Sequence, residues 1–292
     1  MITHLLAVDG GGTKTALRLT PLDPLTADPF FTLTLGPSSL TQQGKQAIEL
    51  IQHAIAACLE QHRLRAEQVS IVVGVAGAGN LELKQQLQLA LAKYPYCQVT
   101  TDAHISLLGA NQGQPTNVIA IGTGSVASQI NRDGEVKIFG GWGFPIGDQG
   151  GGAWLGQQSI RVLIHTLEGA PPSPLTAHLK HNIGDSRAEV IAWLKRATAT
   201  EFAQLAPDVI RLAEQSCPDS LAILSEGCWH IDRLIAKCCE NNDLDIAFLG
   251  SLGAYYQSRL GNPWQPRVIQ PKGDALDGAI WLAKQQVENN NE

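Results

Sequence analysis

The chain has no run of basic residues. It contains 21 lysines and arginines against 27 aspartates and glutamates, a formal net charge of -6, and its pI is near 5.7. Because nucleic acids and acidic lipids are bound by clustered positive charge, the composition excludes a nucleic-acid partner. Long apolar runs are missing too, and no stretch reaches the roughly 18 residues that would cross a bilayer. No membrane association is therefore expected.

Cysteine pairs spaced for metal or redox chemistry are also missing. None of the six cysteines belongs to a C-x-x-C motif, so they are typical of reduced thiols. The first 20 residues lack a basic start, and glycines interrupt their apolar run, so no signal peptide is predicted. These features favour a cytoplasmic protein.

Charged residues are scarce, at 16%, while 44% of residues are hydrophobic, which excludes a disordered chain. The length of 292 residues suggests two packed halves. Glycine is plentiful: 29 residues, about 10% against a usual share of about 7%. The glycines cluster, mostly at the ends of apolar runs, at 10–12, 74–79, 122–124, 140–152 and 250–253.

The apolar pattern predicts strands followed by helices in both halves, which indicates an α/β fold. Strands are predicted at 4–8, 15–20, 30–35, 69–76, 97–100, 118–121, 125–130, 135–139 and 245–249. Helices are predicted at 41–62, 81–92, 103–111, 151–167, 187–197, 201–215, 219–241 and from about 251. Three prolines, at 171, 172 and 174, predict a surface loop.

The first glycine cluster, Asp9 to Thr15, lies between two predicted strands. Its spacing matches neither a P-loop nor a dinucleotide fingerprint, both of which open a helix. A hairpin turn lined with glycines still cradles phosphate, because bare backbone N–H groups point into its concavity. Asp9, just before the turn, is placed to bind Mg²⁺. The alternative is a plain hairpin turn, although three consecutive glycines exceed what such a turn needs.

Two later clusters extend this interpretation. The segment 122–125 again lies between two strands and, taken alone, is a tight turn. Paired with the first cluster, it suggests a duplicated strand-hairpin unit whose two loops grip one polyphosphate from either side of a cleft. The segment 250–254 lies where a strand meets a helix, and small residues there admit a flat base or simply allow close packing.

The motifs DGGGTKT, TTDA, IGTGS, GGWGFPIGDQGGGAW and LGSLGA occur in this order. This order resembles the N-acetylglucosamine kinase and BadF/BadG/BcrA/BcrD ATPase family of the actin/hexokinase/Hsp70-like fold. The FPIGDQGGGA and QPKGDALDGAIWLA stretches look more like the bacterial glucosamine kinases. The resemblance covers about residues 4–283. It implies a two-lobed actin-like (ribonuclease H-like) ATPase fold, each lobe a mixed sheet flanked by helices, with lobes at 1–112 and 113–274. The C-terminal helix, at about 275–287, would pack back on the first lobe.

The resemblance also implies a role for particular residues. Asp9 would bind the metal, and Asp102 would be the catalytic carboxylate that accepts the proton of the sugar hydroxyl. The positions implied for ATP are Gly11, Gly12, Thr13, Lys14, Thr123, Gly124, Gly250, Ser251 and Gly253. The positions implied for the sugar are Ser39, Asp102, Ser125, Gly141, Trp142, Gly143 and Asp148.

Each of these residues also has an ordinary structural interpretation. Asp102 and Asp148 both precede predicted helices, where an aspartate is a common N-cap. Trp142 is either a wall against the sugar or a core residue. His178 and His181 are interpreted as surface histidines, and Cys238 and Cys239 as helix packing.

The sequence thus predicts an ATP- and Mg²⁺-dependent amino-sugar kinase that phosphorylates the 6-hydroxyl of N-acetylglucosamine or glucosamine. The alternative is an ATP-hydrolysing activator of the BadF type, which needs cysteines for an iron-sulfur cluster; a non-catalytic sensor would lack Asp102. The loop 36–40 has serine where the kinases carry an asparagine, and Val126 replaces a polar residue. The 2-substituent of the sugar therefore stays undecided, and a homodimer is left open.

Overall fold

The computed structural model describes residues 1–23, 31–259, 261 and 263–289. The chain forms two compact units, which are described separately. Unit 1 comprises Met1–Pro115 and Pro271–Glu292, and unit 2 comprises Thr116–Gln270. In the part of the chain that the model describes, no helix is both long enough and apolar enough to cross a membrane.

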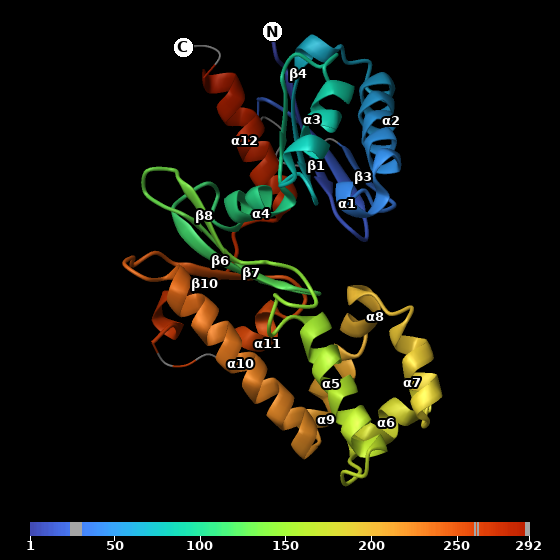
Figure 1. The fold of residues 1–292 in the computed structure, drawn as a ribbon. Helices are drawn as coiled ribbons and strands as arrows, with labels where there is room; N and C mark the ends of the chain where they lie inside the picture. Colours follow the sequence, from blue (N-terminus) through green and yellow to red (C-terminus); the bar gives the residue numbers. More distant parts are fainter. Residues whose placement is uncertain (24–30, 260, 262, 290–292) are drawn as a thin grey trace. The chain divides into compact units, whose positions relative to one another are not determined.

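In each unit three consecutive strands come first and helices follow (Figure 1). The strands are β1 (His4–Gly10), β2 (Thr15–Pro21), β3 (Phe31–Leu35), β4 (Val69–Val75), β5 (Cys97–Thr100), β6 (Thr116–Ile121), β7 (Ser125–Ile130), β8 (Val136–Gly140), β9 (Ile246–Leu249) and β10 (Val268–Ile269). The α-helices are α1 (Leu40–Gln43), α2 (Lys45–Gln61), α3 (Leu81–Ala90), α4 (Asp102–Ala110), α5 (Gly152–Leu167), α6 (Pro174–Ile183), α7 (Arg187–Leu194), α8 (Ala199–Ala203), α9 (Ala206–Glu214), α10 (Pro218–Cys238), α11 (Gly253–Gln257) and α12 (Ala275–Asn289). Short 3-10 helices lie at Ala66–Gln68 and Gln265–Arg267.

The sheet of unit 1 has the strand order β3-β2-β1-β4-β5. Strands β1, β2 and β3 form antiparallel pairs, and β1, β4 and β5 run parallel. Because side chains alternate along a strand, Leu6 and Val8 pack into the core under α2 and α3, while Leu5 and Ala7 pack with α4 and α12 on the opposite face. Figure 1 shows these helix pairs on the two faces of the sheet.

The sheet of unit 2 repeats this arrangement. Its order is β10-β9-β6-β7-β8, so β6, β7 and β8 correspond to β1, β2 and β3. Strands β6 and β7 form an antiparallel hairpin, and β9 runs parallel to β6. One large core contains residues of the sheet and of helices α5–α11. The duplicated strand-hairpin unit predicted from the glycine clusters is therefore present.

Several predicted elements differ in their boundaries. The helix predicted at 41–62 is broken at Gly44, whose φ of 52° is left-handed and ends α1. The expected loop at prolines 171–174 gives way to α6 at Pro174, because Ser173 caps the helix and a proline is favoured at its first position. The helix predicted at 201–215 is two helices, α8 and α9, and the one expected from 251 is shorter. Residue 30 of the third predicted strand lies outside the described residues.

Candidate active site

In unit 1, the carboxyl ends of the parallel strands β1, β4 and β5 meet at one edge of the sheet, which is the usual place for a site in an α/β protein. The hairpin loop after β1 is held by its backbone: Gly11 N–H donates to Lys14 O at 2.9 Å, and Ser38 N–H donates to Gly11 O at 3.0 Å. Gly12, Thr13 and Lys14 are exposed on this loop. The first glycine cluster therefore forms an ordered turn with an accessible surface.

Asp9, the next-to-last residue of β1, faces the α4 side of the sheet because it alternates with Leu5 and Ala7. Burial, followed by the negative charges of Asp102 and Asp274, raises the pKa of Asp9 to about 6, against a smaller opposing effect of Lys14. A partly buried carboxylate among other carboxylates is stabilised by a bound cation. No group of three or more histidine, cysteine or acidic side chains among the described residues could hold a metal by itself.

Asp102 is the first residue of α4 and lies two residues after the end of β5. The helix is capped by Thr101, whose Oγ1 accepts a hydrogen bond from His104 N–H at 3.1 Å. The interpretation of Asp102 as the N-cap is therefore wrong, because the N-cap residue is Thr101. Burial raises the pKa of Asp102. Hydrogen bonds from the backbone N–H groups of Ala103 and Asp102 have a smaller, opposite effect on this pKa. A raised pKa makes the carboxylate a better proton acceptor.

The serines of the loop after β3 are buried. Ser39 is 2% exposed, and its Oγ lies 3.0 Å from Thr41 Oγ1. Ser38 is fully buried, and its Oγ accepts a hydrogen bond from Thr15 Oγ1 at 2.6 Å. Both hydroxyls thus have partners in the protein, and the bond between Ser38 and Thr15 ties this loop to the start of β2.

In unit 2, three loops are joined by backbone hydrogen bonds. Gly152 N–H and Ala153 N–H, at the start of α5, donate to Gly122 O at 2.8 Å and Thr123 O at 2.9 Å. Leu252 N–H donates to Ile121 O at 2.9 Å. Within the described chain the N–H groups of Thr123 and Gly124 make no hydrogen bond. These two N–H groups are therefore available to a ligand. They lie beside the N-terminus of α5, where an anion is stabilised.

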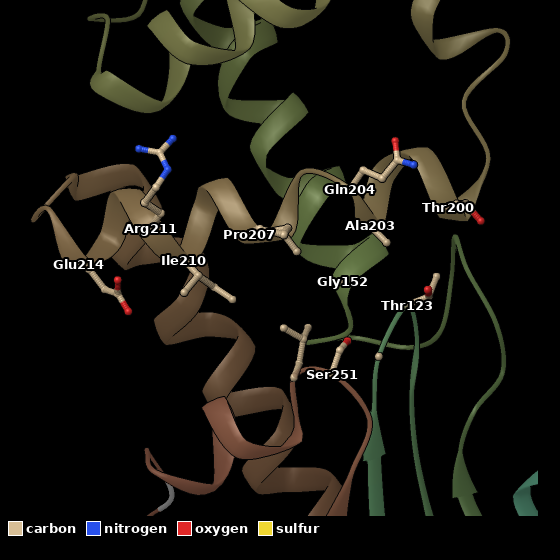
Figure 2. Close-up of a pocket in the computed structure, with 13 residues that line it drawn as sticks. Thr123, Gly152, Thr200, Ala203, Gln204, Pro207, Ile210, Arg211, Glu214 and Ser251 are labelled. Carbon is tan, nitrogen blue, oxygen red and sulfur yellow. The ribbon is translucent and has the colours of Figure 1, made fainter. Parts of the chain in front are cut away.

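These loops form one end of a cavity of about 530 Å³ (Figure 2). Figure 2 shows Thr123 at one end, Arg211 and Glu214 at the other, and Ser251 between them. The cavity is lined by Gly122, Thr123, Gly152, Thr200, Ala203, Gln204, Ala206, Pro207, Ile210, Arg211, Glu214, Ser251 and Leu252. Its size is typical of small-molecule sites, and it joins an apolar wall to a loop of glycines. This fits a ligand with a flat base and a phosphate tail.

The sequence prediction placed a helix in this region but did not identify α8 and α9 as a wall of the cavity. Thr198 and Glu201 form a capping box that begins α8, and Pro207 lies in the first turn of α9. Both signals predict helix starts at these positions. Neither signal reveals that one side of these helices faces the loops 122–124 and 250–253, because that contact is made only in the folded unit.

A smaller cavity, of about 60 Å³, lies elsewhere in unit 2. It is lined by Ser125, Gly140, Trp142, Asp148, Gln149, His230 and Leu234. Asp148 Oδ1 accepts a hydrogen bond from Gly143 N–H at 3.0 Å. Ser125 Oγ donates to Gln149 O at 2.8 Å. The structure thus brings the predicted sugar positions Ser125, Trp142 and Asp148 to one cavity, with Gly141 and Gly143 on either side of Trp142.

Two alternatives for these residues are wrong. Helix α5 is capped by Gly151 without a side-chain cap, so Asp148 is not its N-cap. Trp142 is 87% exposed, so it is not a core residue. Burial raises the pKa of Asp148, against the hydrogen bond from Gly143 N–H, which lowers it. An exposed indole beside a carboxylate offers an apolar face and a polar group together, which is the combination that a sugar ring needs.

The remaining polar residues that the sequence drew attention to are structural. His178 Nε2 lies 3.0 Å from Asp208 Oδ2. Arg211 donates a hydrogen bond to the other carboxylate oxygen of Asp208, Oδ1, at 2.8 Å. Cys238 and Cys239 are buried against the core of unit 2, as predicted. All six cysteines carry free thiols.

Comparison with known proteins agrees with this architecture. The chain is 25% identical to the glucosamine kinase of Vibrio cholerae over 292 residues, 99% of this chain and 98% of that protein. It is 29% identical over 170 residues, 56% of this chain and 55% of that protein, to the N-acetylmuramic acid/N-acetylglucosamine kinase of Clostridium acetobutylicum.

A crystal structure from Chromobacterium violaceum, of a protein proposed to be an N-acetylglucosamine kinase, superposes with a TM-score of 0.85 and 31% identity. The superposition covers 97% of this chain and 99% of the Chromobacterium violaceum chain. This likeness, with the two equivalent five-stranded sheets, confirms the predicted α/β fold class. The model of the BadF/BadG/BcrA/BcrD ATPase family matches residues 6–252. The chain therefore belongs to the BadF/BadG/BcrA/BcrD ATPase family.

Proposed function

We propose that this protein is an ATP-dependent amino-sugar kinase that transfers the γ-phosphate to the 6-hydroxyl of glucosamine or N-acetylglucosamine. The observation that carries the proposal is Asp102: a partly buried carboxylate just after a parallel strand, on a residue that is not the N-cap of its helix. Phosphoryl transfer to an alcohol needs one such carboxylate to orient and deprotonate the hydroxyl. Relatives that bear sugar-kinase names support the same reaction.

The larger cavity of unit 2 is the proposed nucleotide site. The unpaired N–H groups of Thr123 and Gly124 would hold phosphate oxygens, and the first turn of α5 adds a favourable dipole. The base would lie between Ser251 and the apolar side of α9, near Ile210. Gly250 and Gly253 shape the turn beside it. In unit 1, the proposed phosphate loop is Gly11, Gly12, Thr13 and Lys14.

The residues present fit Mg²⁺ held through one carboxylate, since Mg²⁺ keeps several waters and binds substrate phosphates besides one or two protein ligands. Asp9 would be that ligand, because its buried carboxylate is surrounded by negative charge. When bound, the metal neutralises charge on the phosphate oxygens during transfer.

The smaller cavity of unit 2 is the proposed sugar site. Asp148 would accept hydrogen bonds from ring hydroxyls, Ser125 would contact a substituent, and the exposed Trp142 would cover an apolar face of the ring. Ser39 is a weaker candidate, because its hydroxyl is buried and already paired with Thr41. The glucosamine kinase relative spans the whole chain, so glucosamine is the first substrate to test.

The alternative, an ATP-hydrolysing activator, is not favoured. Iron-sulfur ligation requires several thiolates at one place, whereas no group of three or more histidine, cysteine or acidic side chains among the described residues could hold a metal. We also propose a cytoplasmic location, which the free thiols and the need for ATP support.

A coupled ADP-release assay tests the function directly. The purified protein is given Mg²⁺-ATP with glucosamine, N-acetylglucosamine, N-acetylmannosamine, N-acetylmuramate, glucose or no sugar. We expect ADP release to depend on an amino sugar and the product to carry phosphate at the 6-position, identified by NMR. ADP release that is equal with and without every sugar would identify an ATPase and reject the kinase.

Replacing the metal ligand separates its function from its effect on stability. Asp9→Asn should remove Mg²⁺-dependent turnover and yet raise the melting temperature by roughly 3 to 6 °C near pH 8. The pKa of Asp9 is raised from 3.8 to about 6, so the folded state binds the proton more tightly than the unfolded chain. The stability that this proton contributes is complete below about pH 4 and is lost as the pH rises through about 6. The gain of the variant should therefore fall to about one third of its pH 8 value at about pH 4.5.

Thermal unfolding at the two pH values, without metal, measures this difference. The control is Asp23→Asn, which removes an exposed carboxylate of the same unit. An equal gain for Asp9→Asn at both pH values would contradict the assignment of a raised pKa. Full Mg²⁺-dependent activity in this variant would contradict Asp9 as the metal ligand.

A further inference from the structure

We infer that His230 is a sugar-binding residue of the smaller cavity and that its imidazole exchanges a hydrogen bond with a hydroxyl or amino substituent of the pyranose ring. This rests on the proposed function, and it adds a contact from α10, an element that none of the glycine motifs reaches. The inference is carried by three features of His230: its place in the cavity, the way its ring is held, and its free hydrogen-bonding capacity.

His230 lies on the same cavity wall as Leu234, one helical turn further along α10. The opposite lining comes from Ser125, Trp142 and Asp148, which are separated from His230 by more than 80 positions in the sequence. A ligand that contacts Asp148 in this cavity is therefore also close to the imidazole. Because the cavity volume is only about 60 Å³, a single ring substituent fills it.

The imidazole ring is fixed by aromatic neighbours. Its centroid lies 5.3 Å from that of Trp154 at an interplanar angle of 74°, and 4.8 Å from that of Trp229 at 72°. Both are edge-to-face contacts, which favour one orientation of the ring. Trp154 is 6% exposed and belongs to the core, so the ring rests on a rigid support.

Among the described residues the imidazole of His230 makes no hydrogen bond, and its one polar contact is a long ion pair with Glu226, one turn earlier on the same helix. Glu226 Oε1 lies 3.8 Å from Nε2. An imidazole presents one donor and one acceptor when neutral, and two donors when protonated. A hydroxyl or an amino group satisfies either form. An oriented, half-buried ring in a polar cavity, whose nitrogen atoms make no hydrogen bond within the described chain, is suited to a ligand contact.

Two substitutions separate binding from packing. His230→Phe keeps an aromatic ring against Trp154 and Trp229 but removes both nitrogen atoms. His230→Gln removes the ring but keeps a donor and an acceptor. We expect the phenylalanine variant to raise KM for the sugar by about 2- to 10-fold, the effect of one lost hydrogen bond. The glutamine variant should recover most of the affinity. KM for ATP should not change in either variant.

Steady-state kinetics with glucosamine, N-acetylglucosamine and glucose measure these effects, and the matched control is His181→Phe, at an exposed histidine on α6. A KM increase confined to the amino sugars assigns the contact to the 2-substituent, and an equal increase for all sugars assigns it to a ring hydroxyl. If His230→Phe behaves as wild type while His230→Gln is impaired, the residue is structural and the inference is wrong. If the wild-type protein phosphorylates no sugar, the proposed function itself fails.

Discussion

Asp102→Asn is expected to lower sugar-dependent ADP release by about 10²- to 10⁴-fold while leaving ATP binding unchanged. Asparagine has nearly the same shape as aspartate, but it cannot accept the proton of the sugar hydroxyl. Since Asp102 is in unit 1 and the proposed nucleotide cavity is formed by residues of unit 2, nothing in that cavity is altered. The rate is measured by coupled ADP release, and ATP binding by calorimetry with a non-hydrolysable analogue.

The control for this variant is Thr101→Ala, which removes the N-cap of the same helix. Loss of a cap destabilises by about 1 kcal/mol, so this variant should melt at a lower temperature and keep its turnover. If both variants lose activity equally, the effect of Asp102→Asn comes from disturbing α4. Near wild-type turnover of Asp102→Asn would reject Asp102 as the proton acceptor.

Local signals in the sequence were sufficient for most of the fold. The alternation in β2, the continuous apolar run of β4 and the amphipathic pattern of α2 are each formed by neighbouring residues. The helix boundaries that were misplaced also have local causes, which are backbone conformation and helix capping. Gly44 breaks a periodic apolar pattern through its backbone conformation, and Pro174 begins a helix where a cluster of prolines suggested a loop.

The candidate site was only partly predictable for a different reason. Asp9, Asp102 and the glycine loops are found by motif because each occupies a fixed place at the end of a strand. Ile210 and His230 come from helices that carry no such motif. They reach their cavities only through packing across unit 2, which the order of residues along the chain does not specify.

Gly250→Ala is expected to weaken nucleotide binding by more than about tenfold and to destabilise unit 2 by about 1–3 kcal/mol. The φ of Gly250 is 83°, a left-handed conformation that a β-carbon disfavours. A β-carbon there would also clash with Ile121 O. This oxygen accepts the hydrogen bond from Leu252 N–H that ties the turn at 250–253 to the end of β6.

Relief of the clash must therefore move Ile121 and, with it, the adjoining Gly122–Thr123 end of the proposed nucleotide cavity. Calorimetric titration with a non-hydrolysable ATP analogue and thermal unfolding measure the two effects. Gly79→Ala is the matched control, because a β-carbon at Gly79 meets no atom within 4 Å. If Gly250→Ala binds nucleotide as tightly as this control, the strand-to-helix turn does not shape the nucleotide site, and the base must bind elsewhere.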